Sequence, residues 1–271
     1  MITITEQPSK YRHLEKMTID EITANINNED STVASAVKKV LPQVNKLIEV
    51  IVDKLRNGGR LFYIGAGSGG RLSVLDIIEL PTTYGVEKGM IISILAGGVD
   101  RLIDALEEEE DNAEAGWQAL VDHRAGSKDI VVGISASGST PFVLGALKKC
   151  RENDITTGCI VSNPATLIAE QADLPVEVIT GPEFISGSTR MKCGTAQKML
   201  FDMISTTTMI QLGKIEDNKM VNVKLINNKI TDRAVKILMD QAGIKDYEAA
   251  KTVLLKYGSV KNALDALAKV I

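Results

Sequence analysis

Serine, threonine and glycine gather in two short segments of the sequence that are suited to hold an anion. The first runs from Gly65 to Arg71 (GAGSGGR) and the second from Ser135 to Pro141 (SASGSTP). Glycine lets backbone N–H groups approach a ligand closely, and hydroxyl groups add further donors. Together they can hold a phosphate without a lysine or a metal ion. The expected phosphate ligands in these segments are Ser68, Gly69, Ser137, Gly138, Ser139 and Thr140.

Each of these segments also has a simpler explanation. The glycine-rich one is compatible with an ordinary tight turn between a strand and a helix, and similar patterns occur in dinucleotide-binding folds. In the serine-rich one, a single hydroxyl could cap a helix that begins at Pro141, with the others in solvent. The presence of two such segments in one chain favours a phosphate site over two unrelated turns.

A third segment, from Ser186 to Lys198, combines hydroxyl groups with positive charge at the start of an expected long helix. Because the net charge of the chain is −4, an anionic ligand must be held by local groups of this kind. The expected contacts are Ser188, Arg190 and Lys198, with Lys192 as a further cation. The alternative for Lys192 and Lys198 is a solvated surface position, which is the usual one for lysine.

One candidate acid, Glu79, lies near the end of a segment that is apolar nearly all round, from Leu72 to Leu80. Such a helix is expected to be buried, and burial would raise the pKa of the carboxyl group toward the range of a general acid. A carboxylate that is exposed or paired at the end of the helix is an equally good interpretation.

A second candidate, Glu110, belongs to a run of acidic residues from Glu107 to Asp111. Most members of such a run are solvated. At about 100° per residue, however, Glu110 falls within the apolar stripe of an expected helix over residues 100–120. The stripe consists of Val99, Ile103, Leu106 and Trp117. We therefore expect one acid of the run to face the interior.

Apolar runs that resemble strands alternate with helical patterns along most of the chain. We expect strands at 61–64, 90–95, 130–134, 159–161 and 175–179, and helices at 33–55, 71–80, 100–120, 141–150 and 190–212. Continuous apolar runs are typical of strands that are buried on both faces. The pattern predicts an α/β fold with a parallel five-stranded sheet between layers of helices. Ligands bind beyond the carboxyl ends of such strands, where the glycine and serine segments lie.

A polar stretch, Gly213–Lys219, separates this pattern from the C-terminal part of the chain. Residues 230–271 contain three short helical patterns. We expect a domain over residues 1–215, which includes an N-terminal helical segment, and a small helical subdomain over residues 216–271.

The composition narrows the class of protein. The chain has 271 residues and no basic field that would favour nucleic acid or an anionic membrane. No apolar run approaches the roughly 20 residues that span a bilayer. Three cysteines without a C-x-x-C pair, and no signal-sequence pattern, indicate the cytoplasm. Two histidines exclude a histidine-rich metal site and leave acid–base chemistry to carboxylates.

Four motifs taken together resemble one family closely. They are GAGSGGRL at 65–72, ELPTTYG at 79–85, ASGSTP at 136–141 and GSTRMKCGTAQK at 187–198. From about Leu14 to its C-terminal part, the chain resembles the N-acetylmuramic acid 6-phosphate etherases, which have the flavodoxin-like sugar isomerase (SIS) fold. The resemblance implies cleavage of a lactyl ether to N-acetylglucosamine 6-phosphate and D-lactate. It also implies a homodimer, no metal or organic cofactor, and a role in recycling cell-wall sugars.

Matching the motifs places the two catalytic acids of the family at Glu79 and Glu110. The implied reaction is elimination followed by hydration, with Glu110 as our choice for the base at C2 and Glu79 as the acid for the leaving oxygen. The sequence does not decide which acid removes the C2 proton. The chain departs from the family at Ser68-Gly69, where Thr-Ser is usual, at Thr82, where a second proline is usual, and at Ser139, where arginine is frequent.

Two other functions would use the same phosphate-binding loops. A non-catalytic sugar-phosphate regulator, such as the glucokinase regulatory protein, would bind without turnover and lack at least one of the acids. A sugar-phosphate isomerase would need one base and no acid directed at C3. For the homodimer, we expect contact through the N-terminal helices and the helix at 190–212, which carries more apolar residues than one sheet face readily covers. Those residues are Met199, Leu200, Met203, Ile204, Met209, Ile210 and Leu212.

Overall fold

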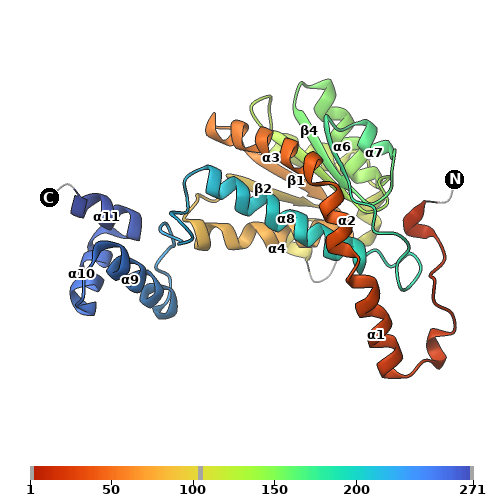
Figure 1. Ribbon diagram of the computed structural model, residues 1–271. Helices are drawn as coiled ribbons and strands as arrows, with labels where there is room; N and C mark the ends of the chain where they lie inside the picture. The colour runs from red at the N-terminus through yellow and green to blue at the C-terminus, as the bar shows by residue number, and fades with distance from the viewer. Residues whose placement is uncertain (1–2, 103–105, 269–271) are drawn as a thin grey trace. The chain divides into compact units, whose positions relative to one another are not determined.

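The structure contains a five-stranded parallel sheet. The computed structural model describes residues 3–102 and 106–268 (Figure 1). The strands follow the order β2-β1-β3-β4-β5, and each neighbouring pair is parallel. Their bounds are β1 (Leu61–Gly65), β2 (Ile91–Leu95), β3 (Ile130–Ser135), β4 (Thr156–Val161) and β5 (Leu174–Glu177). The predicted fold class is confirmed, with each strand within a few residues of its expected place.

The central strands are apolar throughout because helices cover both of their faces. Every residue of β1 and β3 is buried. On one face, Phe62 and Val131 pack against Leu147 of a helix that follows β3. On the other face, the rings of Tyr63 and Phe201 lie 5.1 Å apart, edge to face. Each fully buried side chain of this size contributes about 1.5–3 kcal/mol to folding.

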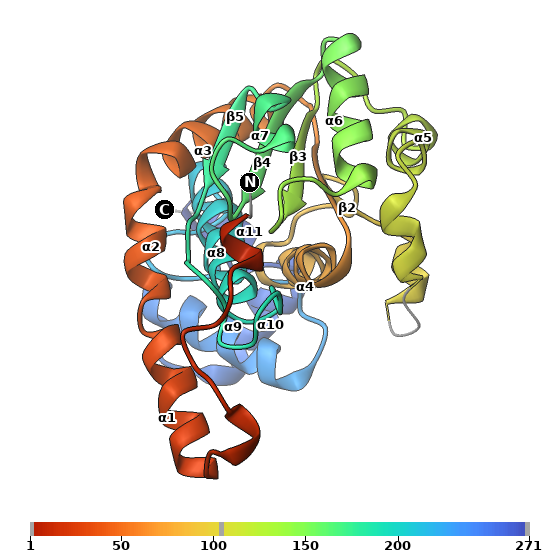
Figure 2. The ribbon, with the colours of Figure 1, turned by 90° about the vertical axis from the view of Figure 1, so that its right-hand side faces the viewer.

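Two layers of helices enclose the sheet. In Figure 2, α5 and α6 lie on one side of the strands, and α3 lies on the other side. The helices of the two layers are α2 (Val33–Lys39), α3 (Leu41–Arg56), α4 (Gly67–Tyr84), α5 (Ala115–Asp122), α6 (Pro141–Glu152), α7 (Leu167–Glu170) and α8 (Lys192–Gln211). Within the described residues, no helix is long and apolar enough to cross a membrane.

Two of the predicted helices are not continuous. The helix expected at 33–55 is divided at Val40, two residues before Pro42, which lies in the first turn of α3 and cannot donate a backbone hydrogen bond. The prediction of one helix over residues 100–120 is wrong. Two 3₁₀ turns, η3 (Val99–Arg101) and η4 (Glu107–Asp111), precede α5 there. Like charges in the acidic run oppose a regular helix there. Residues 103–105, including Ile103 of the expected apolar stripe, lie outside the described residues.

The N-terminal part of the chain begins as an extended segment before its first α-helix. The 3₁₀ turns η1 (Ile4–Glu6) and η2 (Leu14–Lys16) interrupt this segment. The helix α1 (Ile19–Asp30) then starts with a capping box, in which the Thr18 side chain accepts from the Glu21 N–H and Glu21 reaches back to the Thr18 N–H.

The contacts divide the chain into two compact units, residues 1–76 with 89–204 and residues 77–88 with 205–271. In the second unit, α9 (Asn228–Ala242), α10 (Tyr247–Tyr257) and α11 (Val260–Ala268) share an apolar core. They confirm the three expected helical patterns. In the same unit, Lys224 N–H donates to Thr82 O over 3.1 Å. The domain boundary expected at residue 215 stays a prediction.

Candidate functional site

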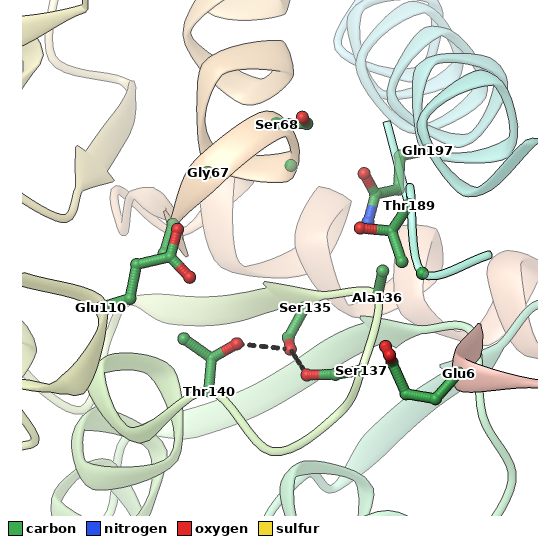
Figure 3. Close-up of a pocket in the computed structure, with 13 residues that line it drawn as sticks. Glu6, Gly67, Ser68, Glu110, Ser135, Ala136, Ser137, Thr140, Thr189 and Gln197 are labelled. Atoms are coloured by element: carbon green, nitrogen blue, oxygen red, sulfur yellow. Dashed lines mark hydrogen bonds between the residues drawn. The ribbon is translucent and has the colours of Figure 1, made fainter. Parts of the chain in front are cut away.

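A cavity of about 230 Å³ lies in the first unit, at the carboxyl ends of β1 and β3 (Figure 3). The order of the strands reverses between β1 and β3, because β2 lies on one side of this pair and β4 on the other. Ligands of open α/β sheets bind at such a switch point. The loop after β1 and the loop after β3 form two walls of the cavity. Both loops are the segments that the sequence singled out.

The carboxyl group of Glu110 lies at the start of α4, directly against Gly67. The backbone of Gly67 has a φ of +52°, which favours glycine. A Cβ atom at this position would lie 2.9 Å from Glu110 Oε1. The first N–H groups of a helix have no partner within it and favour negative charge, so this end of α4 is suited to an anion. Gly67 therefore provides both the turn and the space for Glu110.

The pKa of Glu110 is raised to about 7. Burial is the largest cause, followed by its hydrogen bond with Glu107 and the negative charge of that residue, while Arg71 opposes the shift. Arg71 Nη2 donates to Glu107 Oε1 over 2.6 Å and holds the pKa of Glu107 below its ordinary value. The pair thus divides its roles: Glu107 carries the charge, and Glu110 exchanges a proton near neutral pH. Such a group is suited to general acid–base catalysis.

Three hydroxyl groups of the loop after β3 form a hydrogen-bonded cluster on the floor of the cavity. Ser135 Oγ lies 2.8 Å from Thr140 Oγ1 and 3.2 Å from Ser137 Oγ (Figure 3). Ser135 also accepts from the Gly138 N–H over 3.0 Å. Since Ser135 is buried, it orients the other two hydroxyl groups toward the cavity. The cluster can bind phosphate oxygens without a cation.

The structure brings together some of the predicted site residues and leaves others apart. Those that line the cavity are Ser68, Gly69, Glu110, Ser137 and Thr140. Those that do not are Glu79, Gly138, Ser139, Ser188, Arg190 and Lys198. Ser139 acts indirectly, because its N–H and its hydroxyl each lie 3.3 Å from Ser137 Oγ as donors. Lys198 is half-exposed and forms an ion pair with Asp202 one turn further along α8.

The other candidate lysine of this segment is not solvated at all. Lys192 is 1% exposed, and its Nζ lies 2.5 Å from Glu29 Oε2 of α1. Burial raises the pKa of Glu29, but the ammonium groups of Lys192 and Lys10 more than offset it. The Glu183 carboxylate accepts from the N–H groups of Lys192 and Cys193, each over 2.9 Å, and so caps α8. Lys192 anchors the start of α8 and does not line the cavity.

Several residues of the cavity were not among those expected from the sequence. Ser135, Thr189 and Gln197 lie within quoted motifs but were not chosen as ligands. Gln197 is 2% exposed and approaches Gly69, where a Cβ atom would lie 3.1 Å from its Oε1. Glu6 had no signal in the pattern, because a single acidic residue near the N-terminus is ordinary. It reaches the cavity only through the tertiary structure.

Glu79 lies in the second unit, on an exposed side of α4. The prediction that this helix is buried all round is wrong. Val74 and Leu80 are buried, whereas Leu75 is 46% and Ile78 is 58% exposed. The Glu79 side chain is exposed in the single chain. This agrees with the alternative interpretation of the sequence, an exposed carboxylate near the end of the helix. Helices with one uncovered apolar side are typical of surfaces that bind another protein.

Residues that could hold a metal ion do not cluster here. Within residues 3–102 and 106–268, no group of three or more histidine, cysteine, aspartate or glutamate side chains is arranged for a metal. The cavity instead presents hydroxyl groups, backbone N–H groups and carboxyl groups. Groups of these kinds can bind a polar organic anion and can transfer protons.

Comparisons with known proteins identify the family to which the sequence is similar. The sequence matches the family described as "Glucokinase regulatory protein N-terminal SIS domain" over residues 43–151 and "SIS domain" over residues 114–206. A protein of Bacteroides fragilis is 50% identical over 98% of this chain and 94% of its own length. One from Porphyromonas gingivalis is 49% identical over 97% of this chain and 96% of its own. Both are named N-acetylmuramic acid 6-phosphate etherase.

Solved structures share the fold at low sequence identity. A phosphoheptose isomerase from Neisseria gonorrhoeae has a TM-score of 0.55 at 16% identity, covering 70% of this chain and 98% of its own. Another, from Francisella tularensis, has a TM-score of 0.53 at 16% identity, covering 70% and 99%. At this level of identity the likeness establishes the SIS fold and nothing more specific.

Proposed function

This chain belongs to the N-acetylmuramic acid 6-phosphate etherase family, and we propose that its chemistry takes place in the cavity beyond β1 and β3. It is an enzyme that cleaves the lactyl ether of N-acetylmuramic acid 6-phosphate. Its relatives support this activity and neither the regulator nor the isomerase. The proposed location of the active site rests on one observation. A carboxyl group with a pKa of about 7 lies in the same cavity as a cluster of hydroxyl groups.

The direct experiment is to incubate the pure protein with N-acetylmuramic acid 6-phosphate and to assay D-lactate. Release of D-lactate that is abolished in Glu110→Gln, with the fold intact by circular dichroism, would support the site. Full activity of that variant would remove Glu110 from the mechanism.

The phosphate of the substrate binds at the hydroxyl cluster. Ser137 and Thr140 supply side-chain donors, and Ser68 with the first N–H groups of α4 supplies donors from the opposite wall. Support comes from the fixed geometry of the cluster, in which Ser135 spaces the hydroxyl groups. Ser188, Arg190 and Lys198 are not needed for this arrangement.

The reaction is an elimination followed by a hydration. Opening of the sugar to its aldehyde acidifies the proton at C2, and Glu110 removes this proton as a base. The C3–O bond then breaks, its electrons pass to the lactyl oxygen, and that oxygen takes a proton from Glu79. Water adds to C3 of the unsaturated aldehyde, giving its proton to Glu79, while Glu110 returns a proton to C2. The pKa of Glu110 suits both directions of transfer near neutral pH.

The role of Glu79 rests on the ELPTTYG motif at 79–85 and not on the geometry of the cavity. Its carboxyl group is exposed in the single chain. Replacement of Glu79 by glutamine therefore tests this role directly.

The enzyme acts as a homodimer in which a second copy covers the exposed side of α4. Of the residues expected to form the interface on α8, Leu200, Ile204 and Met209 are buried within the chain, whereas Ile210 is 48% exposed. The apolar side chains left uncovered include Leu75 and Ile78, three residues apart on α4. Their exposure in one chain is what favours a partner there.

The setting is the recycling of cell-wall sugars in the cytoplasm. N-acetylmuramic acid is a sugar of the bacterial cell wall, and its 6-phosphate is a small charged metabolite. The cysteines Cys150, Cys159 and Cys193 are all free and buried, as suits a reducing compartment. Fractionation of the cells that make the protein, followed by assay of the etherase activity, would test the location.

A further inference from the structure

The buried side chain of Asn163 links the N-terminal segment to the loop after β3 by hydrogen bonds. Thr5 is fully buried, and its N–H donates to Asn163 Oδ1 over 3.1 Å. Asn163 Nδ2 in turn donates to Thr5 Oγ1 over 3.0 Å, and to the carbonyl groups of Ala136 and Ser137 over 3.2 and 3.0 Å. The amide thus joins the segment to the backbone of the loop that carries the hydroxyl cluster.

A second anchor joins the same segment to the loop before α8. Ser9 N–H donates to Ser186 Oγ over 2.8 Å, and Ser9 Oγ donates to the Phe184 carbonyl over 2.7 Å. The ring of Tyr11 packs on Phe184 with centroids 5.0 Å apart. The segment therefore has hydrogen bonds to both of the loops between which it runs.

Glu6 lies between these two anchors and lines the cavity. A Cβ atom at Gly187, whose φ is +75°, would lie 3.2 Å from Glu6 Oε2. Figure 3 shows Glu6 beside Ser137, with Glu110 on the far side of Ser135 and Thr140. The chain thus presents a second carboxyl group to the cavity, at the opposite end from Glu110.

A carboxylate accepts hydrogen bonds and donates none. Placed next to the hydroxyl cluster, it repels a free anion that brings no donors of its own. A sugar phosphate brings hydroxyl and amide N–H groups, which can donate to it. The Glu6 side chain therefore disfavours binding of a free anion and favours binding of a sugar phosphate.

We propose that Glu6 is a specificity-determining residue that accepts hydrogen bonds from hydroxyl groups of the sugar and disfavours anions without such donors. This inference rests on the proposed function, because it requires the cavity to be the sugar-phosphate site. It assigns to the N-terminal segment a part in ligand selection, beyond the two acids and the phosphate loops.

The test compares two probes, N-acetylglucosamine 6-phosphate and inorganic phosphate, by isothermal titration calorimetry on the full chain. In Glu6→Gln, the sugar phosphate should bind about tenfold more weakly, as expected for a lost hydrogen bond to a charged group. Inorganic phosphate should bind severalfold more tightly, because a repelling charge is gone. For turnover, KM should rise by a similar factor while kcat changes little. Glu15→Gln is a matched change at an exposed site of the same segment. It should leave the affinities for both probes, KM and kcat unchanged.

In Glu6→Gln, the expected changes in affinity for the two probes have opposite signs. This distinguishes ligand selection by Glu6 from a general structural effect of the substitution. Weaker binding of both probes to Glu6→Gln, or no change in either, would overturn it while wild-type release of D-lactate still upholds the proposed function. A wild-type protein that binds inorganic phosphate but neither binds the sugar phosphate nor releases D-lactate would overturn both.

Discussion

Glu110 and Gly67 are in such close contact that a side chain at residue 67 would have to displace the Glu110 carboxyl group. A Cβ atom at residue 67 would lie 2.9 Å from Glu110 Oε1, and the φ of Gly67 is +52°. The position of the carboxyl group at the start of α4 thus depends on a residue from a different loop. This contact links the glycine-rich segment to acid–base chemistry as well as to anion binding, and it can be tested by adding one methyl group.

Gly67→Ala should displace the Glu110 carboxyl group. We expect kcat for D-lactate release to fall by about 10²-fold, since a shift of about 1 Å in a catalytic group has effects of this size. The positive φ should add a loss of about 1 kcal/mol in the free energy of unfolding. Gly58→Ala is the matched control, because its φ is +79° and nothing lies within 4 Å of the added atom. It should lose similar stability and keep its activity, and equal losses of activity in both variants would contradict the contact.

The pH dependence of kcat/KM should have an acidic limb with an apparent pKa of about 7, the value for Glu110. A base must be deprotonated to act, so activity should fall as the pH decreases through this value. Arg71 lowers the pKa of Glu110, so Arg71→Gln should move the limb to higher pH. The measurement is a rate profile from pH 5 to 9 for both proteins. A limb that stays in place in Arg71→Gln, or one near pH 4.5 in the wild type, would argue against this assignment.

Exchange of the C2 hydrogen in D₂O should distinguish the roles of Glu79 and Glu110. General acid–base catalysis contributes about 10²–10⁴ in rate, so both Gln variants should lose D-lactate release by roughly that factor. Glu110→Gln should also lose C2 exchange, which NMR time courses can follow. Glu79→Gln should retain exchange, because enolisation does not require departure of lactate. The reverse pattern would exchange the two roles, and near-normal release by both would mean that neither acid is catalytic.

Lys192→Met should destabilise the protein strongly, because it leaves the Glu29 carboxylate buried without its closest cation. Removal of one partner from a buried pair costs about 3–5 kcal/mol. The double variant Lys192→Met with Glu29→Gln should recover much of this loss. Lys198→Met breaks an ion pair on the surface of α8 and should cost no more than about 1 kcal/mol. Urea denaturation of the four proteins measures the differences, and equal costs for the two lysines would refute the buried pair.

Ile78→Ser should weaken the homodimer if a second copy covers the exposed side of α4. Ile78 is 58% exposed, and Ile210 of α8 is 48% exposed, which makes Ile210→Ser a matched change on the helix first expected to form the interface. We expect light scattering at micromolar concentration to give a dimer for the wild type and for Ile210→Ser, and a shift toward monomer for Ile78→Ser. A monomeric wild type would exclude the dimer, and the opposite response would return the interface to α8.

Much of the fold followed from local patterns. Continuous apolar runs predicted the strands, since a strand that is buried on both faces has no polar side. The glycine and serine segments predicted the cavity, because parallel strands end at one edge of the sheet. Glu110, which the sequence singled out as the acid that faces the interior, lines the cavity, although the helix expected to carry it was wrong. The 3₁₀ turn η4 presents it instead, and periodicity does not describe so short an element.

The sequence by itself determined the parallel sheet, the two loops that meet at the switch point and the family of the enzyme. Only the tertiary structure decided what each charged residue does. Lys192 and Lys198 lie six residues apart in one motif, yet one is buried against Glu29, 163 positions away, and the other pairs with Asp202 at the surface. Glu6 reaches the cavity through Asn163, which is 158 positions from Thr5. Apolar periodicity is a local property of the chain, whereas a charge or a hydrogen bond takes its role from a partner that folding brings near.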